Sequence, residues 1–484
     1  TAVISHGIAI AYDWCFEAIP ADERAAVREA LKTKAFLPTR KGAWWVRADH
    51  NWNQVCHAGL GLAALAIAED ETAEAAWVLA RAVDSLPVVM RTYGPDGAYA
   101  EGPSYWGFGT TFNVYLLDGM QTALGTDFGL GDIPGFLKTG DYFLHSTGPT
   151  GEYFNYSDCG PRDTPVPAAA WFAARTGRPA LLANEWVWLR RLATAPGGGT
   201  GDTYAPEQTM FLLWAARLPG GPVAPGDLHW SGRGTTPTAY HRSSWSADAT
   251  WIAFKGGTPR TNHAHMDVGS FVIDAQGVRW ATDLGMQNYN KLEKSGIKLW
   301  EMGENSTRWS VFRLSAASHS VLTVDGRPQA LTGRAEIVRH TATRTVIDTS
   351  SAYTGQLGAA RRGVALLPDR SVLIQDEITG GTAPTATVRW AMLTPATVTT
   401  SGSTATLTRD GKTLALRVLE PAGTTVETYS TQPPAAHDEP NPGTVLVGFR
   451  LPLSAGASTT LRIVLTPGGG PVARELPPAQ LSAW

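Results

Sequence analysis

The sequence predicts an α+β chain of two domains, an incomplete α/α toroid of helices followed by an antiparallel β-sandwich. With 484 residues, the chain is longer than a single hydrophobic core usually serves. Helix-forming segments fill the first half, whereas short alternating runs rich in Thr, Val and Arg fill the second. The Gly- and Pro-rich stretch Leu218–Gly226 separates the helical sequence pattern from the alternating one. The predicted domains are therefore residues 1–225 and 227–484.

Helices account for the first half. Ala21–Leu31 combines strong helix formers with apolar residues at helical spacing. The acidic break Glu69–Glu71 divides two further helical stretches, which predicts a helical hairpin. Repeated antiparallel pairs favour a toroid, and part of a complete toroid is expected to lie upstream or to be missing. The candidate helices are Ala21–Leu31, Val55–Ala68, Thr72–Val89, 105–124, 166–176, 180–194 and 206–217.

Short strands account for the second half. Their side chains alternate between apolar and polar, as expected where one face of a sheet is buried and the other is wet. An antiparallel sandwich of two or more sheets follows from this pattern. The clearest candidates are Thr250–Phe254, Ser270–Asp274, Arg370–Asp376, Thr385–Met392 and Ser458–Thr466.

The composition describes a globular protein, with 43% hydrophobic and 17% charged residues. No apolar run approaches the length of a membrane span. The three cysteines, Cys15, Cys56 and Cys159, form no disulfide framework and are expected to be small buried residues. The residues that follow Thr1 do not have the charged and apolar pattern of a signal peptide, so we expect that a leader was removed or was never present.

The charge distribution bears on possible partners. A formal net charge of −3 argues against a general nucleic-acid binder. Residues 1–226 carry 16 Lys and Arg against 23 Asp and Glu, whereas residues 227–484 carry 24 against 20. A polyanion is therefore expected to be drawn to the second half or to the seam between the halves. The sequence does not predict an oligomeric state.

A histidine pair in Thr261–Phe271 is the most informative motif. On a strand, His263 and His265 would face the same way, and imidazoles suit zinc. Asp283 and His319 could complete a metal site. A regular hairpin would place Asp283 about 10 Å along the strand from His265, so the chain must bend near Gly269 for one ion to be shared. From spacing alone, three separately hydrogen-bonded histidines remain an equal alternative.

Two upstream segments also carry polar and aromatic side chains. His50–Asn53 precedes a predicted helix, and Asn51 or Asn53 could simply be its N-cap. Asp96–Gly109 is a Gly- and aromatic-rich loop that contains Glu101, Tyr105 and Trp106. Taken alone, it reads as a tight turn with stacked rings.

Together, these segments resemble the heparinase II/III-like polysaccharide lyases. The resemblance covers most of the chain and implies a toroid, a β-sandwich and an active cleft between them. Each motif is loose by itself, but their order along the chain is specific. The motifs are Asn51–Cys56, Asp96–Gly109, His263–Phe271, Asp283–Tyr289, and His319 with Val324–Gly326.

The resemblance also implies residue roles. Tyr105 is similar to the catalytic tyrosine of the family, His263 to its second acid/base, and His50 or Asn51 to the group that neutralises the substrate carboxylate. A structural Zn²⁺ would be held by His265, Asp283 and His319. Tyr289 would line the cleft. Apart from the resemblance, tyrosine has an unperturbed pKa near ~10 and needs nearby cations to act as a base, and Arg91 and Arg260 are the candidates for that support. The expected substrate-binding residues are Tyr289, Arg91 and Arg260 together with Trp52, Asn53, Glu101 and Trp106.

The expected activity is β-elimination on a uronic-acid-containing polysaccharide such as a glycosaminoglycan or alginate, in a secreted or periplasmic setting. One alternative is a glycoside hydrolase that uses Glu101 with Asp96 or Asp267. Another is a carbohydrate-binding protein without catalysis. The sequence leaves open the uronic acid, its sulfation, endo or exo attack, and syn or anti elimination.

Overall fold

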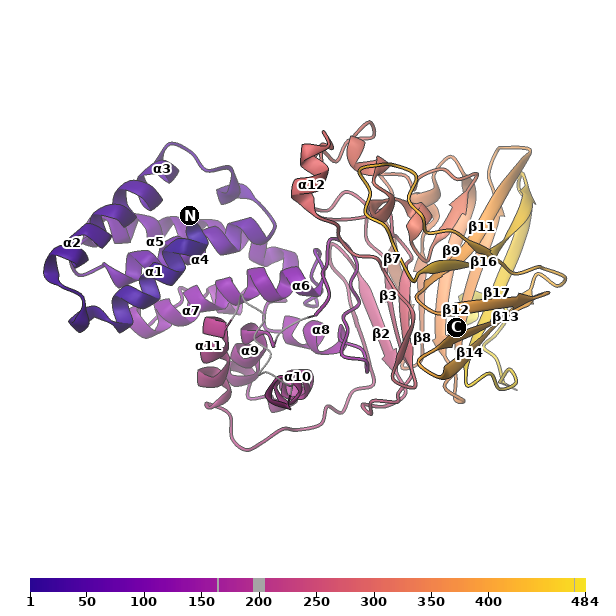
Figure 1. Ribbon diagram of the computed structural model, residues 1–484, viewed down its shortest axis with the longest axis horizontal. Helices are drawn as coiled ribbons and strands as arrows, with labels where there is room; N and C mark the ends of the chain where they lie inside the picture. The colour runs from indigo at the N-terminus through magenta and orange to yellow at the C-terminus, as the bar shows by residue number, and fades with distance from the viewer. Residues whose placement is uncertain (163–164, 195–204, 474) are drawn as a thin grey trace. The chain divides into compact units, whose positions relative to one another are not determined.

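The computed structural model describes residues 1–162, 165–194, 205–473 and 475–484, and it divides the chain into two units (Figure 1). The helical unit comprises 1–97, 104–140 and 164–223, and the β unit comprises 98–103, 141–163 and 224–484. The main crossover thus falls within the predicted Gly/Pro stretch. However, the helical half is not one continuous domain, because residues 98–103 and 141–163 pack within the β unit.

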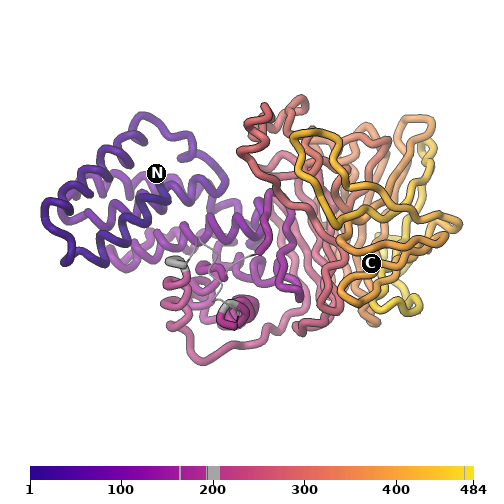
Figure 2. The backbone as a smooth tube through the Cα atoms, viewed as in Figure 1, coloured from indigo at the N-terminus to yellow at the C-terminus, as the bar shows by residue number. Residues whose placement is uncertain are grey.

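Helix α4 (Asn51–Ala66) is the centre of the helical unit, where it contacts α1 (Ala2–Trp14), α5 (Thr72–Met90) and α7 (Thr111–Leu124) (Figure 2). Small residues on α4 allow this close packing. A Cβ added at Gly59 would lie 2.1 Å from the backbone oxygen of Ala2, and one added at Gly61 would lie 2.6 Å from Leu116. Most α4 residues are buried, as expected of a helix enclosed by others.

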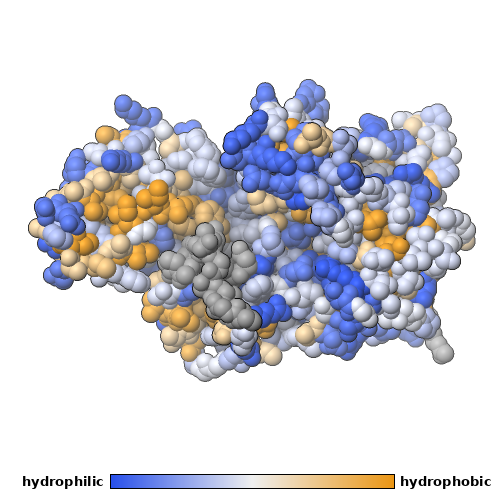
Figure 3. Space-filling model, in the orientation of Figure 1, coloured by the Kyte–Doolittle hydropathy of each residue, from blue (hydrophilic) through white to orange (hydrophobic). Residues whose placement is uncertain are grey.

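The predicted helical order is confirmed. The segment predicted at 105–124 is divided into α6, a π-helical turn η5 (Trp106–Thr110) and α7. Figure 3 shows apolar surface gathered on the helical unit, to which α1 contributes the exposed side chains Val3 and Ile4. No helix in the described ranges is long and apolar enough to cross a membrane. The other helices are α2 Ala21–Ala30, α3 Leu37–Arg40, α6 Pro103–Tyr105, α8 Thr139–His145, α9 Pro167–Thr176, α10 Ala183–Thr194, α11 Ala205–Ala215 and α12 Tyr289–Lys294.

The β unit contains three antiparallel sheets, as the alternating sequence pattern predicted. Their orders are β1-β2-β3-β4-β5, β12-β13-β14-β17-β10-β9-β8-β7 and β15-β16-β11-β6. The strands are β1 His229–Gly232, β2 Thr238–Arg242, β3 Trp251–Lys255, β4 Phe271–Ala275, β5 Val278–Ala281, β6 Leu322–Val324, β7 Glu336–His340, β8 Arg344–Asp348, β9 Leu357–Leu366, β10 Val372–Gly380, β11 Thr385–Thr394, β12 Thr397–Ser401, β13 Thr404–Arg409, β14 Lys412–Glu420, β15 Glu427–Tyr429, β16 Val445–Ser454 and β17 Ser458–Pro467.

One continuous apolar core joins the three sheets of the β unit. Phe271 on β4, Ile374 on β10 and Trp390 on β11 all belong to it, and each is at most 1% exposed. Trp390 is also the cross-strand neighbour of Phe449, and their rings stack with centroids 5.9 Å apart. Such aromatic cross-strand pairs stabilise register in addition to the apolar area they bury.

A chain of hydrogen-bonded histidines links two of these sheets. His241 Nδ1 donates to the carbonyl oxygen of Ala342 at 3.1 Å, so its Nε2 accepts from the Thr345 hydroxyl at 2.7 Å. Thr345 in turn accepts from His340 Nδ1 at 2.9 Å, and His340 Nε2 accepts from His229 Nδ1 at 3.1 Å. Nε2 of His241 and Nε2 of His340 each accept a hydrogen bond in this series. A charged imidazole carries protons on both nitrogens and could not accept, so the series requires His241 and His340 to be neutral. The series therefore joins β1 and β2 to β7 and β8 with His241 and His340 in their uncharged form.

Candidate active site and metal-binding cluster

The histidine motif lies in an irregular loop between β3 and β4, not on a strand. The expectation of two histidines on one strand face is therefore wrong. His263 has a positive φ of 63°, and strand β4 begins only at Phe271. The bend expected at Gly269 is present, with φ of 91°.

Distant segments fix the conformation of this loop. Met266 N–H donates to the carbonyl oxygen of Leu314 at 2.9 Å. Gln329 bonds both backbone groups of Val268, and Arg308 donates to the carbonyl oxygen of Ala264. Bonds of this kind satisfy backbone groups that would otherwise be buried without partners. The loop is therefore shaped by residues far along the chain.

Two carboxylates set the tautomers of two buried histidines in the β unit. Asp158 Oδ1 lies 2.8 Å from His265 Nε2, and Asp283 Oδ2 lies 2.9 Å from His319 Nδ1. An ionised carboxylate only accepts, so each of these ring nitrogens carries a proton. When a ring is neutral, its other nitrogen, His265 Nδ1 or His319 Nε2, carries a lone pair. Burial lowers the pKa of His265 and favours that form, whereas for His319 the effect of burial is outweighed by the charge of Asp283, which raises the pKa of the ring. A carboxylate behind an imidazole is also the usual way in which proteins orient a metal-binding histidine.

Those two nitrogens are buried and have no hydrogen-bond partner among the described residues, and the same is true of Asp267 Oδ2. His265, Asp267 and His319 offer ligand atoms that all lie within 4.8 Å of one another. Two imidazole lone pairs and a carboxylate oxygen form a donor set that suits zinc. We refer to these three residues as the metal cluster. It contains two of the predicted ligands, with Asp267 in the place given to Asp283.

Asp283 has a different position in the structure from the one expected. Its Oδ1 accepts the backbone N–H of Gly285 at 2.8 Å, and its Oδ2 accepts from His319. Both carboxylate oxygens are thus engaged with protein donors. This arrangement makes Asp283 a positioning group for His319, whereas Asp267 retains an oxygen without a hydrogen-bond partner in the described part of the chain. Asp267 also forms a buried ion pair with Lys255.

Electrostatics around the cluster favour ionised carboxylates. Burial alone would raise the pKa of Asp158, but the hydrogen bond from His265 and the charge of Arg308 lower it to about 2. Burial lowers the pKa of His265, so that ring is neutral near pH 7. Burial also opposes the ionisation of Asp283, yet the nearby His319 lowers the pKa of this carboxyl overall. Neutral imidazole and ionised carboxylate are the forms that bind metals.

His263 lies beside the cluster and has a different carboxylate partner. Its Nδ1 is 3.0 Å from Glu101 Oε2, and both side chains are almost fully buried. Tyr289 stacks on its ring with centroids 6.4 Å apart, and Trp300 meets it edge-on at 5.6 Å. If Nδ1 donates to Glu101, Nε2 is left with the lone pair, which is the arrangement of a general base. Glu101 is therefore buried against His263, whereas a residue that contacts substrate would be exposed to solvent.

Asp158 connects these two groups. Besides His265, it accepts from the Tyr289 hydroxyl at 2.8 Å, and Arg308 lies 3.6 Å away. Its backbone N–H donates to the carbonyl oxygen of His263 at 3.1 Å. Sequence reasoning missed Asp158, Lys255 and Arg308, because nothing local to Ser157–Gly160 points to a histidine more than 100 residues later. It missed Trp300 for the same reason.

The helical unit contains the other predicted catalytic residues. Tyr105 is half-buried and ends α6, just before the π-helical turn η5. Turns of this type are often found at functional sites. Trp106, expected to bind substrate, instead belongs to the core: it is fully buried, donates to Thr139 Oγ1 at 2.8 Å and packs on Phe172. The expectation for Trp106 is therefore corrected.

At the start of α4 the predicted residues separate into two kinds. His50 occupies the N-cap position without a side-chain capping bond, and Asn51 is the first helical residue. Asn53 is fully buried and donates to three backbone carbonyls, those of Val46, Ala48 and Ser85. It anchors the preceding loop and is neither an N-cap nor a substrate contact. Trp52, by contrast, is half-exposed.

Arg91 and Arg260 are exposed, in the helical unit and the β unit respectively. No observation tests whether these two arginines support formation of the Tyr105 tyrosinate, so that role stays a prediction. The three cysteines are free, and Cys56 and Cys159 are buried as expected, whereas Cys15 is exposed.

Comparisons with known proteins agree with this architecture. The family model described as Heparinase II/III-like, C-terminal, matches residues 238–460. A solved structure named Heparinase III-BT4657 gene product aligns with 96% of this chain and 67% of its own, at 15% identity and a TM-score of 0.64. The heparan sulfate lyase HepC from Pedobacter heparinus aligns over 94% and 64%, at 15% identity and a TM-score of 0.62. No curated protein sequence matches significantly.

The match to the heparinase II/III-like C-terminal family model lies entirely within the β unit. A structure titled heparinase III is similar as well, over 93% of this chain, at 14% identity and a TM-score of 0.62. At such identities, the likeness to solved structures establishes the fold. The chain spans 64% to 67% of the length of these structures.

Proposed function

We propose that this protein is a polysaccharide lyase that cleaves a uronic-acid-containing anionic polysaccharide by β-elimination. The observation that carries the proposal is the buried pair of His263 and Glu101, with ring nitrogen and carboxylate 3.0 Å apart. Beside it lies an aromatic wall formed by Tyr289 and Trp300. An imidazole oriented by a carboxylate is suited to abstract a proton. The match of residues 238–460 to the heparinase II/III-like C-terminal family model supports the same reaction class.

In the substrate, the reaction breaks the C5–H and C4–O4 bonds and forms a C4=C5 double bond and a new O4–H bond. A base removes the proton at C5, next to the uronate carboxylate, and the C5–H electron pair becomes the C4=C5 double bond. The C4–O4 bond then breaks, and the departing oxygen takes a proton from an acid. The main barrier arises because the carbanion adds charge to an ionised carboxylate, so hydrogen-bond donors must stabilise that developing charge.

We assign Tyr105 and His263 to proton transfer. Tyr105 would serve as both base and acid when the proton and leaving group lie on one face of the sugar. His263 would take the proton when they lie on opposite faces. His50 and Asn51 would neutralise the carboxylate. The proposal requires one bound uronate to reach Tyr105 and His263 together.

We further propose that the metal cluster holds a structural zinc ion. His265, Asp267 and His319 would be its ligands, and a bound ion would supply only local stabilisation. The three residues join the loop that carries His263 to the segment that carries His319. Their role is to keep the His263 ring in place against Glu101. Secretion or periplasmic export is expected for an enzyme whose substrate is a large polymer.

Two alternatives are less well supported. A glycoside hydrolase needs two available carboxylates, but Asp267 is fully buried against Lys255 and Glu101 faces His263. A carbohydrate-binding protein without catalysis has no need of an imidazole oriented by a buried carboxylate.

Substitution of Tyr105 tests the proposed chemistry. Tyr105→Phe removes only the hydroxyl, so we expect a normal fold by circular dichroism and at least a roughly 100-fold loss of unsaturated product, followed by its ultraviolet absorbance. Heparan sulfate, chondroitin sulfate, hyaluronan and alginate should each be offered. Release of reducing ends without the absorbance would indicate hydrolysis. Near-normal elimination by the variant would remove Tyr105 from the mechanism.

A further inference from the structure

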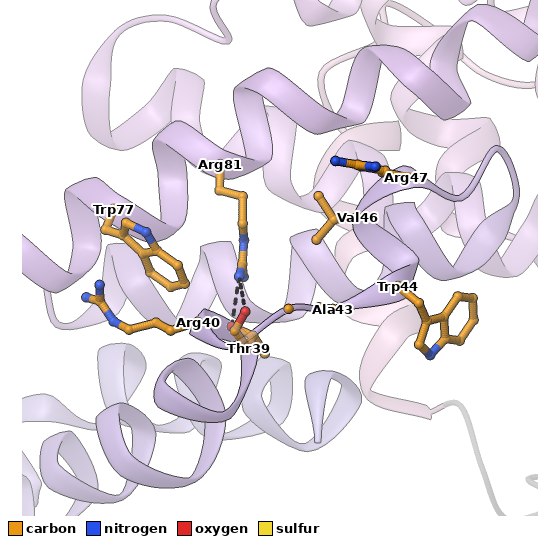
Figure 4. Close-up of a pocket in the computed structure, with 9 residues that line it drawn as sticks. Thr39, Arg40, Ala43, Trp44, Val46, Arg47, Trp77 and Arg81 are labelled. Atoms are coloured by element: carbon orange, nitrogen blue, oxygen red, sulfur yellow. Dashed lines mark hydrogen bonds between the residues drawn. The ribbon is translucent and has the colours of Figure 1, made fainter.

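A cavity of about 500 Å³ lies within the helical unit, apart from the residues assigned above (Figure 4). Its lining includes Thr39, Arg40, Trp44, Arg47, Trp77 and Arg81. A second cavity of about 380 Å³ shares Arg47, Trp77 and Arg81 with it. The two form one groove between α5 and the segment from α3 to η3 (Trp44–Arg47). Its size is in the range of small-molecule binding sites.

The groove carries more positive than negative charge. Arg40 pairs with Glu74 at 2.6 Å, but neither Arg47 nor Arg81 pairs with a carboxylate in the part of the chain that the structure describes. Arg81 donates from Nη1 to Thr39 Oγ1 at 2.8 Å, while its Nε and Nη2 have no hydrogen-bond partner there. Asp84 lines the second cavity and offsets part of this charge. A cation with unused donors favours an anion nearby.

Aromatic rings hold the arginines in place. Trp77 has the guanidinium of Arg40 at 4.1 Å and that of Arg81 at 4.4 Å from its ring centroid. Figure 4 shows Trp77 and Arg40 on one side, Arg81 with Thr39 in the middle, and Trp44 and Arg47 on the other side. Cation–π contacts of this type orient the arginine plane and reduce the side-chain freedom lost on binding.

Trp44 connects the groove to the predicted catalytic segment. Trp44 is 65% exposed, and the centroid of its ring lies 5.1 Å from that of Trp52 and 6.0 Å from that of His50. Two adjoining exposed indoles are a costly surface in water unless a ligand covers them. An indole is also a flat apolar platform of the kind on which a sugar ring packs. The surface therefore continues from His50 across Trp52 and Trp44 towards Arg47.

We propose that this groove binds an anionic sugar unit of the polysaccharide, beyond the unit at which the chain is cleaved. Arg47 and Arg81 meet its carboxylate or sulfate, and Trp44 packs against the sugar ring. The inference rests on the proposed function for the identity of the polymer, but the groove itself is defined by its own residues. It makes the helical unit a contributor to affinity for longer chains.

The test measures binding directly, so that it does not depend on turnover. Titration calorimetry would follow a heparan sulfate decasaccharide binding to the full chain with Tyr105→Phe, alone and combined with Arg47→Gln or Trp44→Ala. An alginate decasaccharide, which has carboxylates but no sulfates, separates the two anionic groups. Arg175→Gln is the matched control, because it removes an exposed positive charge elsewhere in the helical unit.

We expect Arg47→Gln to weaken binding of the decasaccharide about tenfold, as loss of a charged hydrogen bond implies. Trp44→Ala should weaken it as well, while Arg175→Gln leaves it within about twofold. Arg81→Lys, which retains the charge but not the planar fork, tests the half-buried arginine without risking the fold. Unchanged affinity in both Arg47→Gln and Trp44→Ala would overturn the inference.

The outcome is separable from the proposed function. If the wild-type chain yields no unsaturated product but the groove variants lose affinity, the lyase assignment fails and the sugar site stands. If elimination proceeds and affinity does not respond to the groove variants, the site alone is rejected.

Discussion

Replacing Glu101 by glutamine should show how much the orientation of His263 by this carboxylate contributes to the rate, because the variant retains His263 itself. The carboxylate lies 3.0 Å from His263 Nδ1, and both side chains are about 3% exposed. The Glu101→Gln substitution would keep the size of the side chain and one hydrogen bond but lose the charge. A hydrogen bond to a charged group contributes about 1.5–3 kcal/mol, against about 1 kcal/mol for a neutral one. The difference of roughly 0.5–2 kcal/mol corresponds to a rate about 2- to 30-fold lower.

The assay is the initial rate of unsaturated product across a range of substrate concentrations. Because Glu101 acts through His263 and not on the sugar, kcat should fall while KM stays within about twofold. Glu336→Gln is a suitable control, since Glu336 is exposed on β7 and pairs with Arg334. Equal kcat for Glu101→Gln and the wild type would refute the view that this carboxylate orients the base. A rise in KM alone would restore Glu101 to the role of a substrate contact.

Three further predictions concern the metal, acid stability and packing. Elemental analysis should find about one zinc per chain, and chelation should lower the melting temperature; a metal-free protein with full activity would reject the cluster. Burial lowers the pKa of His241 to about 3 and that of His340 to about 4, so the unfolded chain takes up protons first as the pH falls below about 6.5. The free energy of unfolding, measured with urea, should therefore fall between pH 7 and pH 5. The fall should be about 2 kcal/mol smaller in His241→Gln than in the wild type, because the variant lacks this histidine. An equal fall in both proteins would contradict this reasoning. Gly59→Ala should destabilise the helical unit by about 1–3 kcal/mol, because the new methyl meets the Ala2 carbonyl, whereas Gly7→Ala meets nothing within 4 Å and should be neutral or stabilising. Similar melting temperatures for the two alanine variants would argue against the packing of α1 on α4.

The outcome for individual residues shows which inferences local sequence can support. The strands predicted at Thr385–Met392 and Ser458–Thr466 are found as β11 and β17, within two residues at each end. The helix predicted at Thr72–Val89 is α5. These elements depend on periodicity and propensity over a few neighbouring residues, which the sequence displays directly.

Burial and partners were predicted less well. Asn53 and Trp106 have the residue types of a sugar-binding surface, yet both are enclosed by the helical core. The loop around His263 resembles the start of a strand, but bonds from Leu314, Arg308 and Gln329 give it another conformation. A residue's type does not reveal whether water or protein surrounds it.

The sequence by itself determined the order of helices and strands, the position of the main boundary, and the histidines and tyrosine to consider. Only the tertiary structure decided that Glu101 faces His263, that Asp158 orients His265, and that Asp267 joins the metal cluster. Each of the first two pairs spans more than 100 residues of sequence. Secondary structure follows from interactions between near neighbours along the chain, whereas a buried carboxylate and an imidazole are brought together by the packing of whole elements. Once they are removed from water, the cost of leaving either without a partner fixes the pair.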